Sequence, residues 1–434
     1  MICFRVFCIM NCMKKSAKKY YLLVLGCQMN QADAERVSHL LNDLGWQASM
    51  SDDKADLIVV VACSVRQAAV DRVIGKAQLW QKRRQAGRLT TILTGCVLAK
   101  DRKKLSKFFD SVLPITEMWR LPEIMCGDKA MAVTDYLCLP AQPSSESSAL
   151  VPISNGCNNF CSYCAVPYTR GREKHRPADS IIRECRQLIK RGYKEIILLG
   201  QNVNSYSCDG IDFSQLLSKI DKMPGDYWLR FMTSYPKDLS AELIKVMSNG
   251  RHIAPQLHLA LQSGDDVILK VMNRKYTAKK FLALINSVRR AVPDIAISTD
   301  IIVGFPGESR KQFLNTAKLM RQCRFDMAYL SQYSLRPQTA AAKFNDDVPK
   351  LEKKRREAEL NEILKQTALA NNQKYLGQVE AVLVDGYKAG KCYGRTASGK
   401  VVAFSSKNEL FGQKVKVRIL SVKSFSLAGE RVSG

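Results

Sequence analysis

Short apolar runs alternate with amphipathic stretches over the first hundred residues of the chain. The runs that predict buried strands are residues 21–25, 57–61 and 91–94. The stretch after the first run has apolar residues at helical spacing and stops at Gly45, which is typical of a helix and its end. Ser64 and Gln67 have the spacing of a capping box at the start of a second helix. This alternation predicts a parallel α/β sheet in which the carboxyl ends of the strands share one edge.

The same alternation returns in the middle of the chain. The predicted strands there are residues 149–153, 195–199, 227–232, 256–261, 295–301 and 327–333. Periodic helical stretches, such as residues 180–190, lie between them. About six β/α units follow from this count, fewer than the eight of a full barrel. We therefore expect an open, partial (β/α)6 barrel whose chemistry lies at the carboxyl ends of its strands.

The last part of the chain changes character twice. Residues 350–373 form a charged helical pattern with four basic residues at 353–356, and a solvated helix face is the more common interpretation of such a run than a binding site. Residues 377–434 then show short β patterns with glycine-rich turns, at 379–385, 401–404 and 415–422. A small all-β barrel fits these patterns. Ten basic residues against four acidic ones in this segment indicate RNA binding.

The composition of the chain limits the kinds of partner that it can bind. The chain has 434 residues, which is too many for a single hydrophobic core, so about three domains are expected. Lys and Arg number 67 against 40 Asp and Glu, which gives a net charge of +27. Such a charge attracts polyanions, so nucleic acid is the first candidate partner and an anionic membrane surface the second. No apolar run approaches the roughly 20 residues that span a bilayer, so no membrane insertion is expected.

The first residues of the chain do not resemble an export signal. Residues 1–13 are apolar but are interrupted by Arg5 and lack a small-residue cleavage site, so they indicate a disordered tail or a true start at Met13. The chain has 15 cysteines, an odd number that argues against a disulfide framework. We expect a cytoplasmic protein whose thiols are reduced or bound to metal.

These patterns divide the chain into five parts. Pro140, Pro143 and a serine-rich run mark a surface linker in the second quarter of the chain. The predicted parts are a tail (1–18), an N-terminal domain (19–130), a linker (131–148), a central barrel (149–373) and a terminal β-domain (374–434).

Cys157, Cys161 and Cys164 have the spacing C-x3-C-x2-C on a predicted loop. Three thiolates so close together can bind three irons of a cubane iron–sulfur cluster and leave the fourth iron open to a small molecule. A zinc site that lacks one ligand and ordinary buried thiols are the alternatives. Zinc fits less well because His175, the nearest histidine, lies eleven residues beyond the last cysteine. The spacing therefore favours a cluster that serves as a reaction centre.

Three further cysteines follow the three predicted N-terminal strands directly. They are Cys27, Cys63 and Cys96. Because the carboxyl ends of parallel strands meet at one edge, these cysteines could converge on a second cluster. A buried structural thiol is the more common explanation for any one of them. The residues alone leave both interpretations open.

Several motifs resemble those of the radical S-adenosylmethionine (SAM) methylthiotransferases. The matching strings are Gly156-Cys157 through Pro167-Tyr168-Thr169-Arg170-Gly171-Arg172-Glu173, Leu199-Gly200-Gln201-Asn202-Val203-Asn204-Ser205-Tyr206, Leu257-His258-Leu259 with Gln262-Ser263-Gly264, and Ile302-Val303-Gly304-Phe305-Pro306-Gly307-Glu308. The resemblance extends from about Lys19 to the end of the chain. The first two strings are most similar to the branch that modifies isopentenyl-adenosine in tRNA.

The resemblance implies two [4Fe-4S] clusters and SAM as cofactors. Cys157, Cys161 and Cys164 would hold the catalytic cluster, which binds SAM and cleaves it to a 5′-deoxyadenosyl radical. Cys27, Cys63 and Cys96 would hold the second cluster, which supplies or carries sulfur. The residues expected to contact the cofactor are Tyr163, which would support the adenine, and Gly200, Gln201, Gly304 and Glu308, which would line the cleft. Two SAM molecules would be consumed per turnover, one as methyl donor and one as radical source.

The resemblance also implies the substrate and partners. The product would be a methylthio group at C2 of adenosine-37, beside the anticodon of a tRNA, and the terminal barrel would be a TRAM domain that holds the tRNA backbone. An electron donor such as flavodoxin or ferredoxin, a sulfur source and a monomeric chain are expected. Threonylcarbamoyl-adenosine in tRNA or a ribosomal protein is the alternative target. A non-catalytic RNA-binding protein is a third interpretation.

Three positions depart from the family pattern. Val61-Ala62 replaces an Asn-Thr pair before the second auxiliary cysteine, so two polar groups that could tune a cluster are missing. His175 stands where a small hydroxyl residue is common, and Gln338 replaces a glycine. None of these removes an expected iron ligand, so they bear on the substrate more than on the class of reaction.

Overall fold

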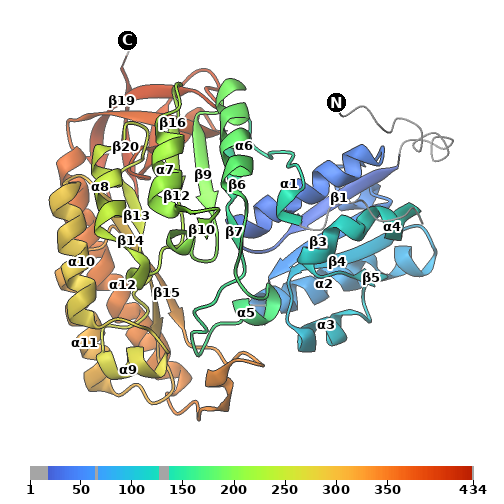
Figure 1. Ribbon diagram of the computed structural model, residues 1–434, viewed down its shortest axis with the longest axis horizontal. Coiled ribbons are helices and arrows are strands. Elements are labelled where there is room, and N and C mark those ends of the chain that lie inside the picture. The colour runs from blue at the N-terminus through green and yellow to red at the C-terminus, as the bar shows by residue number, and fades with distance from the viewer. Residues whose placement is uncertain (1–17, 64–66, 127–135, 433–434) are drawn as a thin grey trace. The chain divides into compact units, whose positions relative to one another are not determined.

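A computed structural model describes residues 18–63, 67–126 and 136–432 of the chain (Figure 1). The predicted N-terminal tail and Ser64 of the predicted capping box lie outside these residues. The described chain forms two compact units. The N-terminal unit comprises residues up to 144 together with 155–158 and 164–173, and the C-terminal unit comprises residues 145–154, 159–163 and 174–434.

The N-terminal unit is built on a five-stranded parallel sheet with the order β2-β1-β3-β4-β5. Its strands are β1 (Lys19–Val24), β2 (Gln47–Ala48), β3 (Leu57–Cys63), β4 (Thr90–Cys96) and β5 (Ser111–Val112). β3 lies at the centre and is buried along nearly its whole length, as its run of β-branched residues predicts. The parallel sheet expected from the alternating pattern is confirmed.

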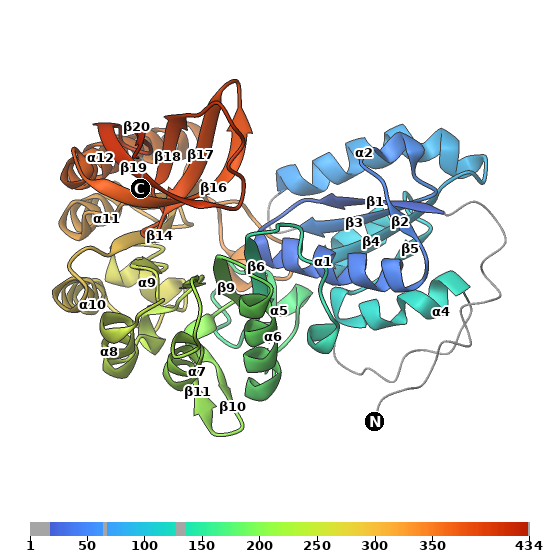
Figure 2. The ribbon, with the colours of Figure 1, turned by 90° about the horizontal axis from the view of Figure 1, so that it is seen from above.

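Helices cover both faces of this sheet. They are α1 (Gln28–Asp43), α2 (Gln67–Gln85), α3 (Ala99–Leu105) and α4 (Leu121–Cys126). Figure 2 shows α1 and α2 on opposite faces. Val73 and Trp80 of α2 pack with Ile58, Val60 and Leu93 of the sheet in one apolar cluster. Burial on both faces holds the carboxyl ends of β1, β3 and β4 in fixed positions.

The C-terminal unit begins with six parallel strands in two groups of three. They are β6 (Ser148–Pro152), β9 (Glu195–Leu199), β12 (Trp228–Phe231), β13 (Gln256–His258), β14 (Ala296–Val303) and β15 (Met327–Gln332). β6, β9 and β12 form one sheet, β13, β14 and β15 form the other, and isolated parallel bridges such as Ser234 to Leu259 join them. The expected partial (β/α)6 barrel is confirmed.

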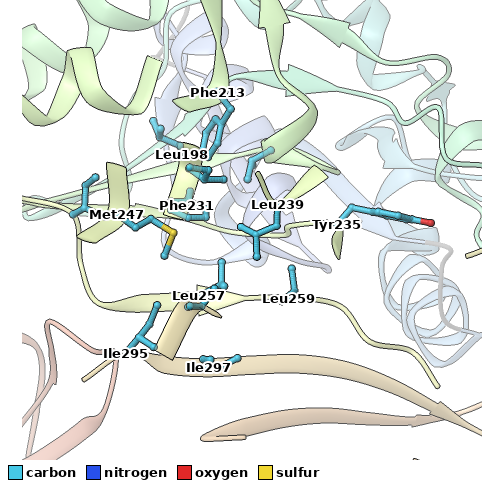
Figure 3. Close-up of a cluster of buried hydrophobic side chains, with 14 of the residues drawn as sticks. Leu198, Phe213, Phe231, Tyr235, Leu239, Met247, Leu257, Leu259, Ile295 and Ile297 are labelled. Carbon is cyan, nitrogen blue, oxygen red and sulfur yellow. The ribbon is translucent and has the colours of Figure 1, made fainter. Parts of the chain in front are cut away.

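Helices enclose the outer side of these strands. The longer ones are α6 (Ala178–Lys190), α7 (Phe213–Asp221), α8 (Ala241–Asn249), α10 (Ala278–Ala291), α11 (Arg310–Cys323) and α12 (Lys350–Asn372). Shorter elements of this unit are α9 (Asp266–Val271), β8 (Lys174–His175), β10 (Ser207–Cys208) and β11 (Ile211–Asp212). The short helix α5 (Val166–Thr169) belongs to the N-terminal unit, and β7 (Ser154–Asn155) has one residue in each unit. Figure 3 shows the core between helices and strands, where Leu198, Phe231 and Leu257 meet Phe213 and Met247.

The chain ends in a closed β-barrel with the order β16-β17-β18-β20-β19. Its strands are β16 (Val379–Lys388), β17 (Lys391–Thr396), β18 (Val401–Ser405), β19 (Lys414–Val422) and β20 (Leu427–Arg431). The sequence pattern predicted the barrel but missed β17 and β20, because their glycines resemble turn signals. In fact a Cβ atom at Gly394 would lie 2.3 Å from the Leu383 carbonyl oxygen, and one at Gly429 would lie 2.1 Å from that of Arg418. These glycines allow close approach of strands.

Polar contacts attach the terminal barrel to the amino ends of the (β/α)6 strands. Arg230 of β12 donates hydrogen bonds to the Thr396 and Ala397 carbonyl oxygens at 2.9 and 2.6 Å. Lys400 pairs with Asp326, just before β15, at 2.6 Å, and both side chains are nearly buried. The terminal barrel therefore lies at the opposite end of these strands from Gly200 and Gly304, which follow β9 and β14.

The basic run at the start of α12 is only partly solvated, so the expectation of a solvated face needs correction. Lys353 and Arg356 are 5% and 4% exposed. Lys353 Nζ lies 2.5 Å from Asp346, and Arg356 pairs with Glu308 and Glu352, each at 2.8 Å. Ion pairing explains this burial, which a charge pattern alone does not reveal.

The predicted surface linker is also partly buried where it is described. Tyr136, Leu137 and Leu139 are at most 2% exposed. The Ser144 hydroxyl donates a hydrogen bond to Glu35 of α1 at 2.7 Å. This segment therefore contributes to the core of the N-terminal unit. No helix within the described ranges is long and apolar enough to cross a membrane.

Candidate functional site

Cys27, Cys63 and Cys96 converge at the carboxyl edge of the N-terminal sheet. Cys27 directly precedes α1, and Cys63 and Cys96 are the last residues of β3 and β4, where they are register partners. Burial raises the pKa of the Cys96 thiol to about 12. The nearby Cys63 and Cys27 add to this rise. Cys63 and Cys27 therefore both lie near Cys96, and a shared cluster site stays a prediction.

Asn30 links the strand ends that carry these cysteines. Its side-chain amide donates to the Ala62 carbonyl oxygen at 2.8 Å and to that of Leu25 at 3.4 Å. Its Oδ1 atom lies 3.5 Å from the Cys96 sulfur. A Cβ atom at Gly26 would lie 2.5 Å from this amide, so the residue before Cys27 must be small. One buried amide thus contacts the backbone close to Cys27 and Cys63 and the sulfur of Cys96.

Arg170 brings a positive charge to the same place. Its side chain and that of Asp33 are both fully buried, and they pair at 2.5 Å. The Nε atom of Arg170 donates to the Cys96 sulfur at 2.8 Å. Burial opposes the charge of Arg170, but Asp33 and Cys96 raise its pKa well above the usual value. The cysteine site therefore contains a permanent cation balanced by one carboxylate.

The donor set fits an iron–sulfur cluster. Three thiols without a histidine among them are the ligands that such clusters prefer. Within the part of the chain that the structure describes, no group of three His, Cys, Asp or Glu side chains has the arrangement of a single metal-ion site. This finding does not favour the zinc alternative. In a cubane cluster each cysteine binds a different iron, so its ligands are spaced more widely than those of one ion.

The central cysteines belong to a loop that contributes to both units. Cys157 and Cys164 are part of the N-terminal unit, and Cys161 is part of the C-terminal unit. The Cys157 backbone N–H donates to the Gly171 carbonyl oxygen at 3.3 Å. Gly156 has a φ of +81°, and a Cβ atom there would lie 2.3 Å from the Arg172 carbonyl oxygen. The residue before Cys157 must therefore be glycine.

Cys161 lies beside a second buried arginine. Arg274 Nη1 approaches the Cys161 sulfur at 3.4 Å, and Nη2 donates to the Ala260 carbonyl oxygen at 2.7 Å. The guanidinium group stacks over Tyr235 with its carbon 4.0 Å from the ring centre. Burial opposes the charge, but electrostatic interaction with Tyr163 and other neighbours raises the pKa of Arg274 well above its usual value. This sulfur thus has a cation close by.

Tyr163 packs on an apolar cluster at the carboxyl ends of β14 and β15. Its ring meets Phe305 edge to face, with centroids 6.5 Å apart. Met272 and Tyr333 belong to the same cluster. The Ser162 backbone N–H donates to the Met272 carbonyl oxygen at 3.1 Å. These contacts hold the segment between Cys161 and Cys164 against the barrel.

The remaining residues expected at the cofactor cleft follow strand ends. A Cβ atom at Gly200 would lie 2.5 Å from Ser154 Oγ, and Gln201 beside it is half-buried. Gly304 has a φ of +65°, and a Cβ atom there would lie 2.4 Å from the Lys353 side chain. A side chain at either position would clash with its neighbours, which explains why both residues are glycines.

Glu308 has two hydrogen-bond donors within the chain. Its carboxylate accepts hydrogen bonds from the Gly304 backbone N–H at 2.7 Å and from Arg356 at 2.8 Å. The side chain is 3% exposed, and burial raises its pKa. The carboxylate therefore shapes the loop after β14 from inside. Contact with a cofactor through this loop stays a prediction.

Two of the departures from the family pattern have a structural account. Gln338 has a φ of +71°, a left-handed conformation that explains why glycine is common at this position. His175 packs against Tyr206 with ring centroids 5.3 Å apart, and its Nδ1 lies 2.7 Å from the Ser207 carbonyl oxygen. Neither residue contacts a site cysteine through these interactions. Val61 and Ala62 are buried in β3.

Three family models match the chain in the order of its parts. Residues 19–115 match the model described as Uncharacterized protein family UPF0004, residues 151–320 the Radical SAM superfamily, and residues 373–432 the TRAM domain. The solved structure of the radical S-adenosylmethionine methyltransferase TsrM from Kitasatospora setae, with cobalamin and a [4Fe-4S] cluster bound, has a TM-score of 0.52 at 13% identity and covers 85% of this chain and 81% of that one. Fold and family define a radical SAM enzyme, which confirms the expected class and its cofactors.

Curated relatives narrow this class. A tRNA-2-methylthio-N(6)-dimethylallyladenosine synthase of Clostridium novyi (strain NT) is 40% identical over 437 residues, covering 95% of this chain and 96% of the relative. A protein of the same name from Acetivibrio thermocellus is 38% identical and covers 96% and 92%. The chain belongs to the family of tRNA-2-methylthio-N(6)-dimethylallyladenosine synthases, and the resemblance inferred from its motifs is confirmed.

Proposed function

We propose that this chain adds a methylthio group to C2 of N6-isopentenyl-adenosine at position 37 of tRNA. The convergence of Cys27, Cys63 and Cys96 carries the proposal, because the reaction needs a sulfur source besides a radical centre. The names of the full-length relatives support the substrate. A non-catalytic RNA-binding protein would have no use for a second set of converging thiols.

The two sets of cysteines have separate roles in this proposal. Cys157, Cys161 and Cys164 hold the cluster that binds SAM, and Cys27, Cys63 and Cys96 hold the cluster that provides sulfur. When bound, these groups supply one-electron reduction of SAM and the transferred sulfur. The chain itself positions and shields them. Tyr163 packs with Phe305, from the loop between Gly304 and Glu308, in one apolar cluster. Arg274 places a cation beside the Cys161 sulfur.

The remaining partners follow from the chemistry. Reduction of SAM needs an electron donor such as flavodoxin or ferredoxin, and repeated turnover needs a sulfur source that refills the second site. We propose that the chain acts as a monomer and in the cytoplasm, where tRNA is found. SAM serves twice in each turnover, as methyl donor and as radical source.

The terminal barrel is suited to holding tRNA at a distance from the reaction. Three of its ten basic residues, Arg395, Lys400 and Lys414, form ion pairs with acidic side chains. The other seven are exposed: Lys388, Lys391, Lys407, Lys416, Arg418, Lys423 and Arg431. β14 has eight residues, so its two ends are ~23 Å apart at about 3.3 Å for each step from one residue to the next. A long polyanion such as tRNA can reach both ends of the barrel strands.

Lys388 and Lys391 are the best candidates for contact with phosphate. They are register partners at the end of the β16–β17 hairpin, and both are exposed. Like charges directly across two strands repel each other, and a bound anion would relieve this repulsion. Replacing both by alanine should weaken tRNA binding for every tRNA sequence and reduce the slope of log affinity against log salt by about 1 for each lost phosphate contact.

This prediction is checked by filter binding or fluorescence anisotropy over a series of salt concentrations. The matched control replaces Lys279 and Lys280, two exposed lysines on α10, by alanine. The control removes the same charge and should leave the slope unchanged. Equal effects of both double variants would show that only the overall charge matters.

The substrate is tested by mass spectrometry of tRNA nucleosides from a strain that lacks the gene. We expect methylthio-isopentenyl-adenosine to disappear, its unmodified precursor to accumulate, and the wild-type gene to restore the product. Retention of this nucleoside together with loss of the threonylcarbamoyl counterpart would overturn the proposed substrate in favour of the alternative tRNA target. If both nucleosides persist, the ribosomal protein or a non-catalytic role becomes the better explanation.

A further inference from the structure

The hydrogen bonds of Arg170 form a complete set. A guanidinium group has five N–H donors in one plane. The five acceptors around Arg170 are the Cys96 sulfur at 2.8 Å from Nε, Tyr136 Oη at 3.3 Å and Asn155 Oδ1 at 3.0 Å from Nη1, and Asn30 Oδ1 at 3.1 Å and Asp33 Oδ2 at 2.5 Å from Nη2. Every donor is used, although the side chain is completely buried.

This geometry determines the direction of the Nε donor. The four acceptors other than sulfur come from α1, the segment at Tyr136 and Asn155, which are separate parts of the N-terminal unit. Because the guanidinium group is rigid and planar, bonds at Nη1 and Nη2 fix the orientation of Nε. The Nε–H bond is therefore aimed at Cys96 before any ligand binds. Lysine has no planar group and cannot reproduce this arrangement.

The charge balance makes the contact with sulfur specific. Asp33 neutralises Arg170, so the pair adds little net charge to the N-terminal unit. What remains at Cys96 is one directed hydrogen bond in a dry environment, where such bonds are strong. Hydrogen bonds to cysteine sulfurs are among the factors that set the reduction potential of iron–sulfur clusters. A donor to a ligand sulfur stabilises the more negative, reduced state.

We propose that Arg170 is a positioning residue that holds the Cys96 sulfur as a ligand and raises the reduction potential of the cluster bound by Cys27, Cys63 and Cys96. This inference rests on the proposed second cluster. It assigns Arg170 to the sulfur-donating site, although the residue lies only six positions after Cys164 in the sequence. The competing explanation is that the Arg170–Asp33 pair only fastens residues 164–173 to the N-terminal sheet.

The test uses the full chain with Cys157, Cys161 and Cys164 replaced by alanine, so that only the second cluster is reconstituted. In this background, Arg170→Gln is combined with Asp33→Asn, which removes the hydrogen bond from Nε without leaving a buried carboxylate unpaired. Arg170→Lys, which keeps the charge, is the second variant. Arg88→Gln is the matched control, because Arg88 is an exposed arginine of the same unit.

Three quantities are measured for each variant: iron content, the midpoint potential of the cluster from a redox titration followed by electron paramagnetic resonance, and the thermal unfolding midpoint of the iron-free protein. We expect both Arg170 variants to have a lower potential than the background and the control to match it. Loss of iron at an unchanged unfolding midpoint would also support the proposal. An unchanged potential with full iron content in the Arg170 variants would overturn it and leave a structural role.

The same experiment gives a different result if the proposed function is wrong. If the background variant and the control bind no iron at all, the second cluster does not exist and both proposals are overturned. If Arg170→Gln with Asp33→Asn does not fold, Arg170→Lys decides the question, because it keeps the ion pair with Asp33 but has no donor at the position of Nε. An unchanged potential in the lysine variant would then contradict the proposal.

Discussion

Replacing Cys161 by alanine is expected to abolish formation of the methylthio product. The proposed cluster needs all three thiolates as iron ligands. Two remaining cysteines cannot retain a cubane cluster that also has to bind SAM at its open iron. Anaerobic reconstitution of the wild-type chain should give about eight irons, and the variant should keep about four at the second site. The measurements are iron content and nucleoside analysis after complementation of the deletion strain.

Two comparisons separate this effect from general damage to the protein. Cys208→Ala removes a half-buried thiol that lies outside both cysteine sets, and it should retain full activity. Cys27→Ala should also abolish the product, but it should retain cleavage of SAM, because it affects the other cluster. Normal product formation by the Cys161 variant would contradict the radical mechanism, and normal product formation by the Cys27 variant would contradict the two-cluster proposal.

The sequence was sufficient for the fold because its strands are short and strongly apolar. The prediction for residues 195–199 coincides with β9, and residues 57–61 fall within β3. Burial on both faces makes such strands nearly continuous apolar runs, so their pattern is easily recognised. The cysteines directly after the strands were equally informative, because strand direction alone brings their positions to one edge.

The arginines beside the cysteines could not be predicted from the same pattern. Arg170 belongs to a recognised motif, but its partners Asn30 and Asp33 lie about 140 residues earlier in the chain. Arg274 reaches Cys161 over 113 residues. A basic residue in a basic chain indicates a solvated surface, and only the fold shows that these two are buried. The position of Asn30, three residues after Cys27, was the one local signal that could have been noticed.

Glu308 and the α12 run show the same limit in another form. The motif from Ile302 to Glu308 predicted a segment that lines a cofactor cleft, which stays a prediction, and the basic run of α12 predicted a solvated helix face. Pairing of Glu308 with Arg356 explains why the second prediction was wrong. Each residue of a buried ion pair is predicted to be exposed when its own sequence segment is considered alone, because the residue that balances its charge lies far away in the sequence.

Arg230→Met is expected to destabilise the C-terminal unit strongly. Arg230 Nε pairs with Glu195 at 2.6 Å, and the two side chains are 5% and 1% exposed. Although burial disfavours its charge, Arg230 and Arg395 lower the pKa of Glu195, so the carboxylate stays ionised. Removing Arg230 leaves this charge without its main partner and removes the bonds to the Thr396 and Ala397 carbonyl oxygens. Loss of one member of a buried pair costs about 3–5 kcal/mol.

The measurement is denaturant unfolding of the C-terminal unit, followed by the fluorescence of Trp228, the neighbour of Arg230, in a chain whose other tryptophans are replaced by phenylalanine. Arg230→Met combined with Glu195→Leu removes both charges and should recover part of the lost stability, because an apolar pair avoids the unpaired carboxylate. It should not recover all of it, since the carbonyl oxygens of the terminal barrel still lack a donor. Arg355→Met on the exposed face of α12 is the control and should change the midpoint little. Full recovery in the double variant would show that Arg230 stabilises the barrel strands alone and does not hold the terminal barrel in place.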